Sequence, residues 1–343
     1  MKATFASDNT AGVSDEIMAA LQRANTAAAA PYGDDEITAE LTEVARGHFG
    51  EQAQIWPVFN GTGANVVALQ AALPRWGAVI CTENSHIATD EGAAPERVGS
   101  IKLLTRRCAE AKLTPGDIVA CASSQGFVHA AQPLAVSITQ STESGTLYST
   151  QEMAALAETA HHYGMIVHVD GARLANAAAA LDVSLRELTY DVGVDVLSLG
   201  GTKNGALAAE AVVVLAPERL SGTDYIRKYS MQLASKHRFI SAQLLELLRA
   251  DLWHRNASHA NRQARALGEG LSRIEGITLR GPTVVNAVFA EMPQHVFDGI
   301  TTAYHCHRWD TSDAGHPVAR LMCAWNTSDD DVEEFLAMAR ELA

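Results

Sequence analysis

The sequence lacks the features that mark membrane-spanning and secreted proteins. No apolar run approaches the length needed to cross a bilayer, and the first residues, Met1–Asp8, contain no apolar signal region. The five cysteines are odd in number and form no Cys-x-x-Cys pair, which argues against a disulfide framework or a thiolate zinc site. We therefore expect a cytoplasmic protein.

Positive charge is also scarce. Lys and Arg number 26 against 40 Asp and Glu, so the formal net charge is −14. This sign disfavours nucleic acid or an anionic membrane surface as the main partner, and a phosphate-bearing ligand would need a local site. With 47% hydrophobic residues, the 343-residue chain is long enough for one large and one small globular domain.

Short apolar segments typical of strands alternate with amphipathic helices over most of the chain. They lie near 55–59, 78–82, 101–104, 134–139, 165–169, 194–199 and 211–215. The last follows its predecessor without a helix between them, so we expect those two strands to be antiparallel. The pattern predicts an α/β fold in which a mostly parallel, mixed sheet is covered on both faces.

We expect three parts along the chain. Residues 1–30 form an N-terminal arm and helix, residues 31–255 the large α/β domain, and residues 256–343 a smaller α+β domain. Helices are expected after Ser14, from Ile37 to a stop at Gly47, and after the Ser149 capping box. The small domain is expected to contain strands near 277–280, 287–291, 304–309 and 319–325, and a final helix after Ser328.

Polar side chains follow several predicted strands. Asp170 ends one strand, and Lys203 follows the next one after Gly200-Gly201, which we read as a flexible turn. Ligands of α/β enzymes bind at the carboxyl ends of strands, and pyridoxal phosphate (PLP) enzymes use a lysine and an aspartate in this way. The alternative is that Asp170 only caps a helix and that Lys203 is a solvated loop residue.

Other side chains are candidates for the same edge of the sheet. His86 follows a strand, and His129 lies in the loop 125–129; a histidine there can stack on a flat cofactor or transfer a proton, or can be structural. The glycine turn 60–65 opens a helix whose N-terminus suits an anion, although it can also be a plain cap. Arg320 can bind a carboxylate or form a surface ion pair.

A metal site is not expected. His305 and His307 alternate with Cys306 on a predicted strand, so the two imidazoles share one face and the thiol points to the other. Zinc needs a further ligand of suitable geometry, and neither His316 nor another residue supplies one.

Together these segments resemble the low-specificity L-threonine aldolases, PLP enzymes of the aspartate-aminotransferase-like fold. The resemblance covers almost the whole chain and rests on Ser7-Asp-Asn-Thr-Ala-Gly12, Tyr32-Gly-Asp-Asp35, Gly61-Thr-Gly-Ala-Asn65, His86, His168-Val-Asp-Gly-Ala-Arg173 and Gly200-Gly-Thr-Lys-Asn204. The His-x-Asp-Gly-Ala-Arg motif is the most specific of these.

The resemblance implies a role for each matching residue. Lys203 would form the Schiff base, Asp170 would pair with the pyridine nitrogen, and His86 would stack on the ring. Gly61, Thr62 and Gly63 would hold the phosphate. The substrate would contact Arg173, Arg320, Ser7 and Tyr32, with His129 near its β-hydroxyl and Arg173 also beside the cofactor. The base would be His86 or His129.

The implied reaction is the reversible cleavage of L-threonine, L-allo-threonine and related β-hydroxy-α-amino acids, such as phenylserine, to glycine and an aldehyde. A β-eliminating lyase or an enzyme like serine hydroxymethyltransferase is the alternative, and a non-catalytic PLP-fold subunit is a more distant one. The implied assembly is a homotetramer, a dimer of dimers with active sites at subunit interfaces.

Two departures from the family pattern leave details open. The segment 231–239 differs from the common glycine-rich one, so Lys228, Lys236 or Arg238 is a candidate for the phosphate, including the phosphate of a neighbouring subunit. Lys203-Asn-Gly replaces the commoner Lys-Gly-Leu-Gly, so the substrate range does not transfer.

Overall fold

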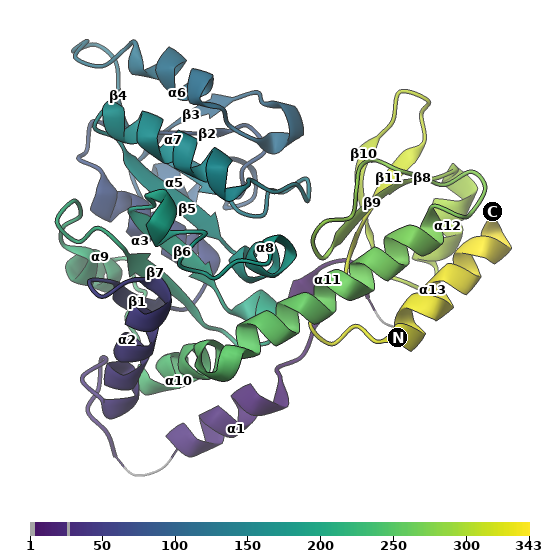
Figure 1. Ribbon diagram of the computed structural model, residues 1–343, viewed down its shortest axis with the longest axis horizontal. Helices are drawn as coiled ribbons and strands as arrows, with labels where there is room; N and C mark the ends of the chain where they lie inside the picture. The colour runs from purple at the N-terminus through teal and green to yellow at the C-terminus, as the bar shows by residue number, and fades with distance from the viewer. Residues whose placement is uncertain (1–3, 26–27) are drawn as a thin grey trace.

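The structure, a computed structural model, describes residues 4–25 and 28–343. Residues 1–3 and 26–27, which belong to the predicted N-terminal arm, lie outside the described residues. Figure 1 shows two bodies joined by one long helix, with the larger sheet on the left and the smaller on the right. None of the helices in the described ranges has the length and apolar character needed to cross a membrane.

A seven-stranded mixed sheet forms the larger body, in the order β1-β7-β6-β5-β4-β2-β3. Its strands are β1 Gln54–Val58, β2 Gly77–Thr82, β3 Lys102–Arg106, β4 Gln132–Thr139, β5 Ile166–Gly171, β6 Val196–Gly200 and β7 Glu210–Val214. The strand β7 pairs antiparallel with both β6 and β1, and the other pairs are parallel. The predicted mixed, mostly parallel sheet is confirmed.

Helices cover both faces of this sheet (Figure 1). On one face lie α3 Gly61–Ala72 and α9 Thr223–Tyr229. The other face packs against α2 Glu36–Phe49, α6 Pro115–Ala122, α7 Thr150–His162, α8 Leu174–Leu181 and α10 Arg238–Leu248. Because both faces are covered, central strands such as β2 and β5 are buried along their whole length and read as continuous apolar segments.

Local signals place most helix starts, but two helices are longer than their signals indicate. Ser149 and Glu152 form the expected capping box of α7, and α6 begins at Pro115. However, α2 runs past Gly47 to Phe49, whose side chain is fully buried, and ends at Gly50 with φ +102°. The helix α3 begins directly at Gly61, so the glycine turn is itself the first helical turn.

The smaller body is a four-stranded antiparallel sheet in the order β10-β11-β9-β8. Its strands are β8 Thr278–Leu279, β9 Ala287–Glu291, β10 His307–Thr311 and β11 Pro317–Met322. Helices α11 Leu252–Leu271, α12 Gln294–Thr301 and α13 Asp329–Leu342 pack on it, and α13 follows the Ser328 cap as predicted. The strand β10 starts at His307 rather than at residue 304, so His305 precedes the strand.

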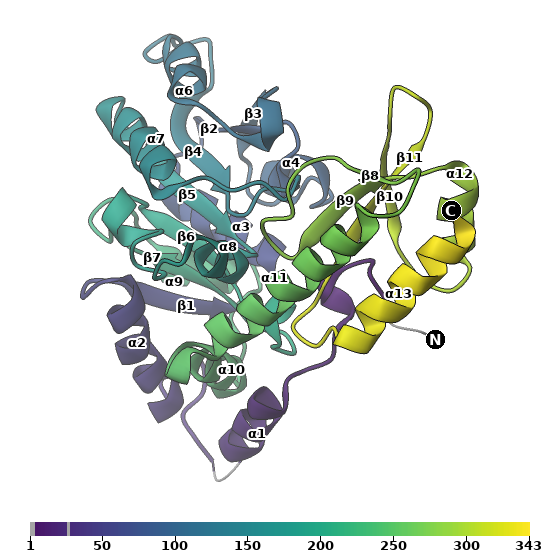
Figure 2. The same ribbon diagram turned by 45° about the vertical axis from the view of Figure 1, so that its right-hand side comes forward.

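Two segments connect the bodies. The helix α11 places Trp253 and Ala257 in the large core, and Leu267 and Leu271 in the small one, so position 256 falls inside a continuous helix (Figure 2). The N-terminal arm crosses in the same way, because Phe5 packs in the small core and α1 Asp15–Ala24 packs against α10. The arm therefore carries residues 6–12 past the junction of the two bodies.

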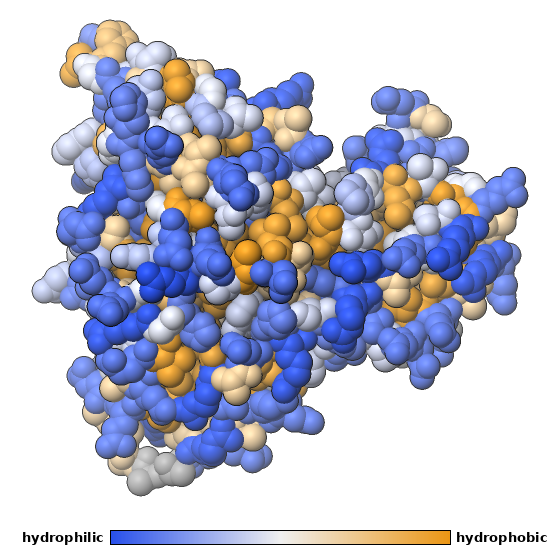
Figure 3. Space-filling model, viewed as in Figure 1, coloured by the Kyte–Doolittle hydropathy of each residue, from blue (hydrophilic) through white to orange (hydrophobic). Residues whose placement is uncertain are grey.

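The surface in the view of Figure 3 is largely hydrophilic, with apolar residues gathered around the junction near α8. The helix α8 is rich in alanine, and Ala180 packs against Val285 and Met322 of the small body. Small side chains on α8 thus allow the two bodies to approach closely.

Candidate active site

A cleft of about 400 Å³ lies where the carboxyl ends of the large sheet face the small sheet. Its walls come from the arm, the large body and the small body, and include Ser7, His86, Glu143, Arg173, Lys203, Trp309 and Arg320. An inner pocket of about 60 Å³ shares His86, Arg173 and Lys203 with the cleft and reaches Asp170 and Gly61. Residues that are distant in sequence thus meet at one place, as strand order predicts.

Lys203 reaches the cleft because the chain just before it is tightly packed. A Cβ atom on Gly200 would lie 2.5 Å from the carbonyl oxygen of Ala172, and one on Gly201 would clash with the carbonyl oxygen of Ala209. Both glycines have φ values outside the left-handed region. The pair therefore serves close packing and not the flexible turn that the sequence suggests, and Lys203 lies on a one-turn helix, Thr202–Asn204.

The environment of Lys203 lowers its pKa and so shifts it toward the neutral amine. Burial lowers the pKa of Lys203 and Arg173 lowers it further, while the carboxylates of Asp8 and Asp170 oppose the shift. A neutral amine is the nucleophilic form that reacts with an aldehyde carbonyl.

One amide joins two carboxylates at the floor of the inner pocket. The Asn65 side chain donates to Oδ2 of Asp170 at 2.9 Å and to Oε1 of Glu91 at 2.8 Å. Nδ1 of His86 lies 2.9 Å from the same Oε1. This hydrogen bond with Glu91, partly offset by burial, raises the pKa of His86 and favours the protonated ring. This chain of hydrogen bonds, from Asp170 through Asn65 and Glu91 to His86, holds the Asp170 carboxylate and the His86 ring in place in the wall of the pocket.

The N-terminus of α3 forms another wall. Asn60 caps the helix by accepting the N–H of Gly63 at 2.7 Å, and Gly61 lines the inner pocket with Thr62 beside it. Gly63 does not line the inner pocket, and the side chain of Gln232 occupies the space where its Cβ would be. Gln232 also accepts the N–H of Phe59 at 3.0 Å, so the segment 228–238 meets this turn through an uncharged residue.

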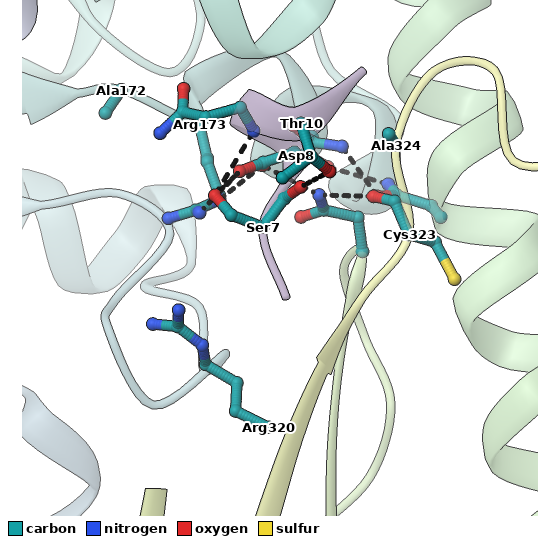
Figure 4. Close-up of polar contacts among 12 residues, drawn as sticks. Ser7, Asp8, Thr10, Ala172, Arg173, Arg320, Cys323 and Ala324 are labelled. Atoms are coloured by element: carbon teal, nitrogen blue, oxygen red, sulfur yellow. Dashed lines mark hydrogen bonds and ion pairs between the residues drawn. The ribbon is translucent and has the colours of Figure 1, made fainter. Parts of the chain in front are cut away.

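Two arginines lie at the outer end of the cleft. Arg173 makes a paired contact with Asp8, Nε to Oδ2 at 2.7 Å and a terminal nitrogen to Oδ1 at 2.8 Å. Figure 4 shows the Asp8 carboxylate between Arg173 and the segment around Cys323. Asp8 also accepts from Asn286 at 3.0 Å, so it links the arm to both bodies.

Arg320 supplies the second guanidinium. It donates to the carbonyl oxygen of Ala6 at 3.3 Å and lies 5.1 Å from the ring centre of Trp309. Its Nε is buried and has no hydrogen-bond acceptor among the described residues. Burial lowers the pKa of Arg320, and the nearby charge of Arg173 adds to the shift. Arg320, whose charge is not paired with a carboxylate in the described part of the chain, and the neighbouring Arg173 could together bind a small anion such as a carboxylate beside Ser7.

The structure places His129 outside the cleft, so its predicted position near the substrate is wrong for its own chain. It lines a separate shallow pocket with Trp76, Gly77 and Lys102, where β2, β3 and β4 begin. The loop that carries it precedes β4, and in a parallel sheet the loops before strands lie at the edge opposite to the loops after strands. His129 is therefore at the wrong end of the sheet to contact a ligand in the cleft of its own chain.

Tyr32 and the cationic segment also lie elsewhere. The backbone N–H of Tyr32 donates to Ser235 at 3.0 Å, and the Lys228 ammonium lies 4.9 Å from the Tyr32 ring centre. Arg238 donates to the carbonyl oxygen of Ala24 at 3.0 Å, and Lys236 is exposed. Among the residues described in one chain, none of these four lines the cleft.

The histidine-rich strand contributes to the cleft wall through His307. The rings of His305 and His307 have centroids 5.6 Å apart. Within residues 4–25 and 28–343, no three or more His, Cys, Asp or Glu side chains are grouped to hold a metal ion.

Four polar side chains of the site are given no role by the sequence, namely Asp8, Asn65, Glu91 and Glu143. Asn65 and Glu143 lie in polar segments after strands, and Asp8 adjoins Ser7, so their positions carry a signal in the sequence. Glu91 carries none, because only the folded loop brings it to His86.

The groups present fit the cofactor that the sequence resemblance implies. A buried amine, a carboxylate held by an amide, an imidazole and a helix N-terminus surround one pocket. The amine matches the aldehyde of PLP and the carboxylate matches its pyridine nitrogen. The imidazole matches the ring, and the helix N-terminus matches the phosphate. The unpaired Nε of Arg320 lies on the side where an amino-acid carboxylate would bind.

Comparisons with known proteins agree with this site. Residues 4–294 match the model of the beta-eliminating lyase family. The low specificity L-threonine aldolases of Pseudomonas aeruginosa and of another Pseudomonas species are 38% and 39% identical to the chain, and each match covers 98% of this chain and 96% of the relative.

Solved structures share the architecture. A threonine aldolase structure from Leishmania major superposes with a TM-score of 0.94 at 26% identity, covering 99% of both chains. A structure of SPT with PLP shares the fold alone, with a TM-score of 0.71 at 15% identity, covering 99% of this chain and 87% of the other. The chain therefore belongs to the beta-eliminating lyase family and groups within it with the low-specificity L-threonine aldolases.

Proposed function

We propose that the protein catalyses the PLP-dependent, reversible cleavage of L-threonine, L-allo-threonine and related L-β-hydroxy-α-amino acids, such as phenylserine, to glycine and an aldehyde. The observation that carries the proposal is the convergence of Lys203, Asp170 and two arginines on one cleft. The near full-length similarity to relatives named for this activity supports it.

In this proposal each part of the pocket holds one part of the cofactor. Lys203 binds the aldehyde carbon through its neutral amine, and Asp170, oriented by Asn65, holds the proton on the pyridine nitrogen. His86 lies against the ring, and the N-terminus of α3 at Gly61 and Thr62 receives the phosphate. When bound, PLP supplies an electron sink for bond cleavage at Cα.

The outer part of the cleft holds the substrate. Arg173 and Arg320, with Ser7, bind the α-carboxylate, which fixes the orientation of the Cα substituents. Asp8 holds Arg173 in place through two hydrogen bonds, so the arm and the small body both contribute to substrate binding.

The proposal extends to assembly and location. Tyr32, Tyr225, Tyr229 and Met231 are exposed on or beside α9, and we propose that a second copy of the chain covers them in a symmetric homotetramer. Light scattering of the purified protein measures this directly. We also propose the division into a large domain, 31–255, and a small domain, 256–343, in a cytoplasmic enzyme.

Cofactor colour and product analysis test the activity. The purified protein should bind PLP with a visible absorption band, and Lys203→Ala should lose both the band and aldehyde release. Lys102→Ala, a change of the same type at an exposed position of β3, should keep both. A wild-type protein that stays colourless with added PLP would contradict the proposal.

The products separate the alternatives. Threonine and phenylserine, each as both diastereomers, should yield acetaldehyde or benzaldehyde together with glycine. Release of ammonia and an oxo acid would instead indicate a β-eliminating lyase. A requirement for a pterin carrier would indicate hydroxymethyl transfer.

A further inference from the structure

Glu143 is a carboxylic acid in the cleft that the roles assigned above do not use. It lies in the loop that follows β4, and it lines both the outer cleft and the inner pocket. The same two walls contain Lys203 and Arg173. Its side chain therefore borders the space between the groups proposed to hold the cofactor and those proposed to hold the substrate carboxylate.

The loop fixes the position of this side chain. The N–H of Gln140 donates to the carbonyl oxygen of Asp170 at 2.9 Å, which ties the loop to β5. Thr142 and Thr146 close the loop with hydroxyls 2.6 Å apart. Oε1 of Glu143 accepts the backbone N–H of His86 at 2.8 Å.

The second oxygen of this carboxyl group is free for chemistry. Oε2 of Glu143 is buried and receives no well-formed hydrogen bond from any described residue, while the nearby Thr139 side chain acts on the carboxyl group only as a minor effect that lowers its pKa. A buried carboxyl oxygen without a partner is costly, and such atoms occur where a ligand supplies the missing hydrogen bond. A substrate hydroxyl is a donor of this kind.

The pKa shifts of the two side chains favour Glu143 over His86 as the base. Burial raises the pKa of Glu143 to about 7, and the nearby Asp170 carboxylate adds to the shift. A group with a pKa near the working pH can both take and release a proton. The ring of His86, in contrast, is held toward its protonated form by Glu91 and lacks a free lone pair in that form.

We propose that Glu143 is the catalytic residue that removes the proton from the substrate β-hydroxyl group. The proposal rests on the aldolase activity proposed above. The Glu143 carboxylate takes the hydroxyl proton, the O–H electron pair becomes the second bond of the aldehyde carbonyl, and the Cα–Cβ bond breaks with its pair left at Cα. Glu143 releases its proton to water, and Cα gains one as glycine forms, so the reaction is balanced in protons.

Other charged groups also face this position and shape its pH dependence. Besides Glu143, the acids of the cleft and the inner pocket are Asp90, Glu91 and Asp170. The basic groups come from five parts of the chain and are His86, Arg173, Lys203, His307, Arg308 and Arg320. Substitution of Glu143 itself, rather than a pH profile of the wild type alone, is therefore needed to assign the titration.

The substitution Glu143→Gln tests the proposal, because glutamine keeps the shape and can still accept the N–H of His86. We expect the turnover for aldehyde release to fall by at least about 100-fold, which is a typical contribution of a general base. The rise of the wild-type rate with pH near 7 should also be absent from the variant. Glu83→Gln, at a surface ion pair with Arg107, is the matched control and should resemble the wild type.

A second readout separates chemistry from positioning. Exchange of the glycine Cα proton in deuterium oxide requires the cofactor and Lys203 but involves no β-hydroxyl, so Glu143→Gln should change it by no more than about threefold, below the effect of a lost base. Equal losses of exchange and aldehyde release would overturn the proposal. Aldehyde release by the variant close to that of the wild type would overturn it too.

Two further outcomes are informative. If Glu143→Gln loses the visible cofactor band, Glu143→Asp replaces it, and that variant should keep a pH-dependent rate because it keeps a carboxylate. Loss of the band in both variants would show a structural role and refute the inference. Absence of aldehyde release from the wild type would refute the proposed function itself, which the variant results alone cannot do.

Discussion

The ion pair between Asp8 and Arg173 should be a major contributor to the stability of this protein, and Asp8→Asn tests its strength. The Asp8 side chain is 1% exposed and that of Arg173 is 18% exposed, so solvent screens their interaction weakly. Burial, the largest single effect, would raise the pKa of Asp8, but Arg173 together with Lys203 and Asn286 lowers the pKa from 3.8 to about 2. The lowered pKa corresponds to roughly 2 kcal/mol of native-state stability.

The sign of the pH dependence follows from the lowered pKa. The stabilisation is complete above the unfolded-state pKa near 4 and is lost as the pH falls through the native value of about 2. Asp8→Asn removes the titrating group and leaves the guanidinium charge of Arg173 without the carboxylate that neutralises it. The stability difference between wild type and variant should therefore be constant from about pH 7 to pH 5 and should shrink below about pH 4.

Urea unfolding of the cofactor-loaded protein measures the difference. We expect Asp8→Asn to lower the free energy of unfolding by about 2–3 kcal/mol, in the range found when one partner of a buried ion pair is removed. Glu246→Gln is the control, since it breaks the exposed pair with Arg23 and should cost less than about 1 kcal/mol. Equal shifts in the two variants would refute the reasoning.

Three more predictions follow from the site and its packing. Arg320→Gln should keep the visible band but raise KM for the amino acid by about 10–100-fold, since a charged hydrogen bond is lost; an unchanged KM would remove Arg320 from the site. His129→Phe should keep turnover within about twofold, because His129 lies at the far edge of the sheet; a large loss would place it in a neighbouring active site. Gly200→Ala should lower the free energy of unfolding in urea by at least about 2 kcal/mol, because the new Cβ would clash with Ala172. Gly47→Ala lies inside α2 with open space around it and should raise the free energy of unfolding by about 0.5–1 kcal/mol. The reverse order of the two variants would contradict the packing argument.

The active site depends on contacts that span the chain. The arm supplies Ser7 and Asp8, the large body supplies Lys203 and Asp170, and the small body supplies Arg320. Asn286 and Arg173 hold the same carboxylate of Asp8 from opposite bodies. Substrate binding is therefore expected to depend on how closely the two bodies approach, and Asp8 is the residue that joins them.

Local sequence patterns were sufficient to predict the strands, the helix caps and the main chemical groups of the site. The antiparallel β7 follows from the short connection after β6, which has no crossover helix, and the roles proposed for Lys203 and Asp170 follow from motifs at strand ends. These features are readable because burial periodicity, capping and short motifs depend on neighbouring residues only.

Which side chains meet across the cleft could be determined only from the folded structure. His129 and His86 look equivalent as histidines in polar loops, yet one loop precedes a strand and the other follows one, which places them at opposite edges of the sheet. The link from Asp170 through Asn65 and Glu91 to His86 has no fixed spacing along the chain. Motifs thus indicate the family, whereas chain packing selects Glu143 and Asp8. Contacts across 57 positions, as between Glu143 and His86, or across 165, as between Asp8 and Arg173, depend on strand order and on loop closure.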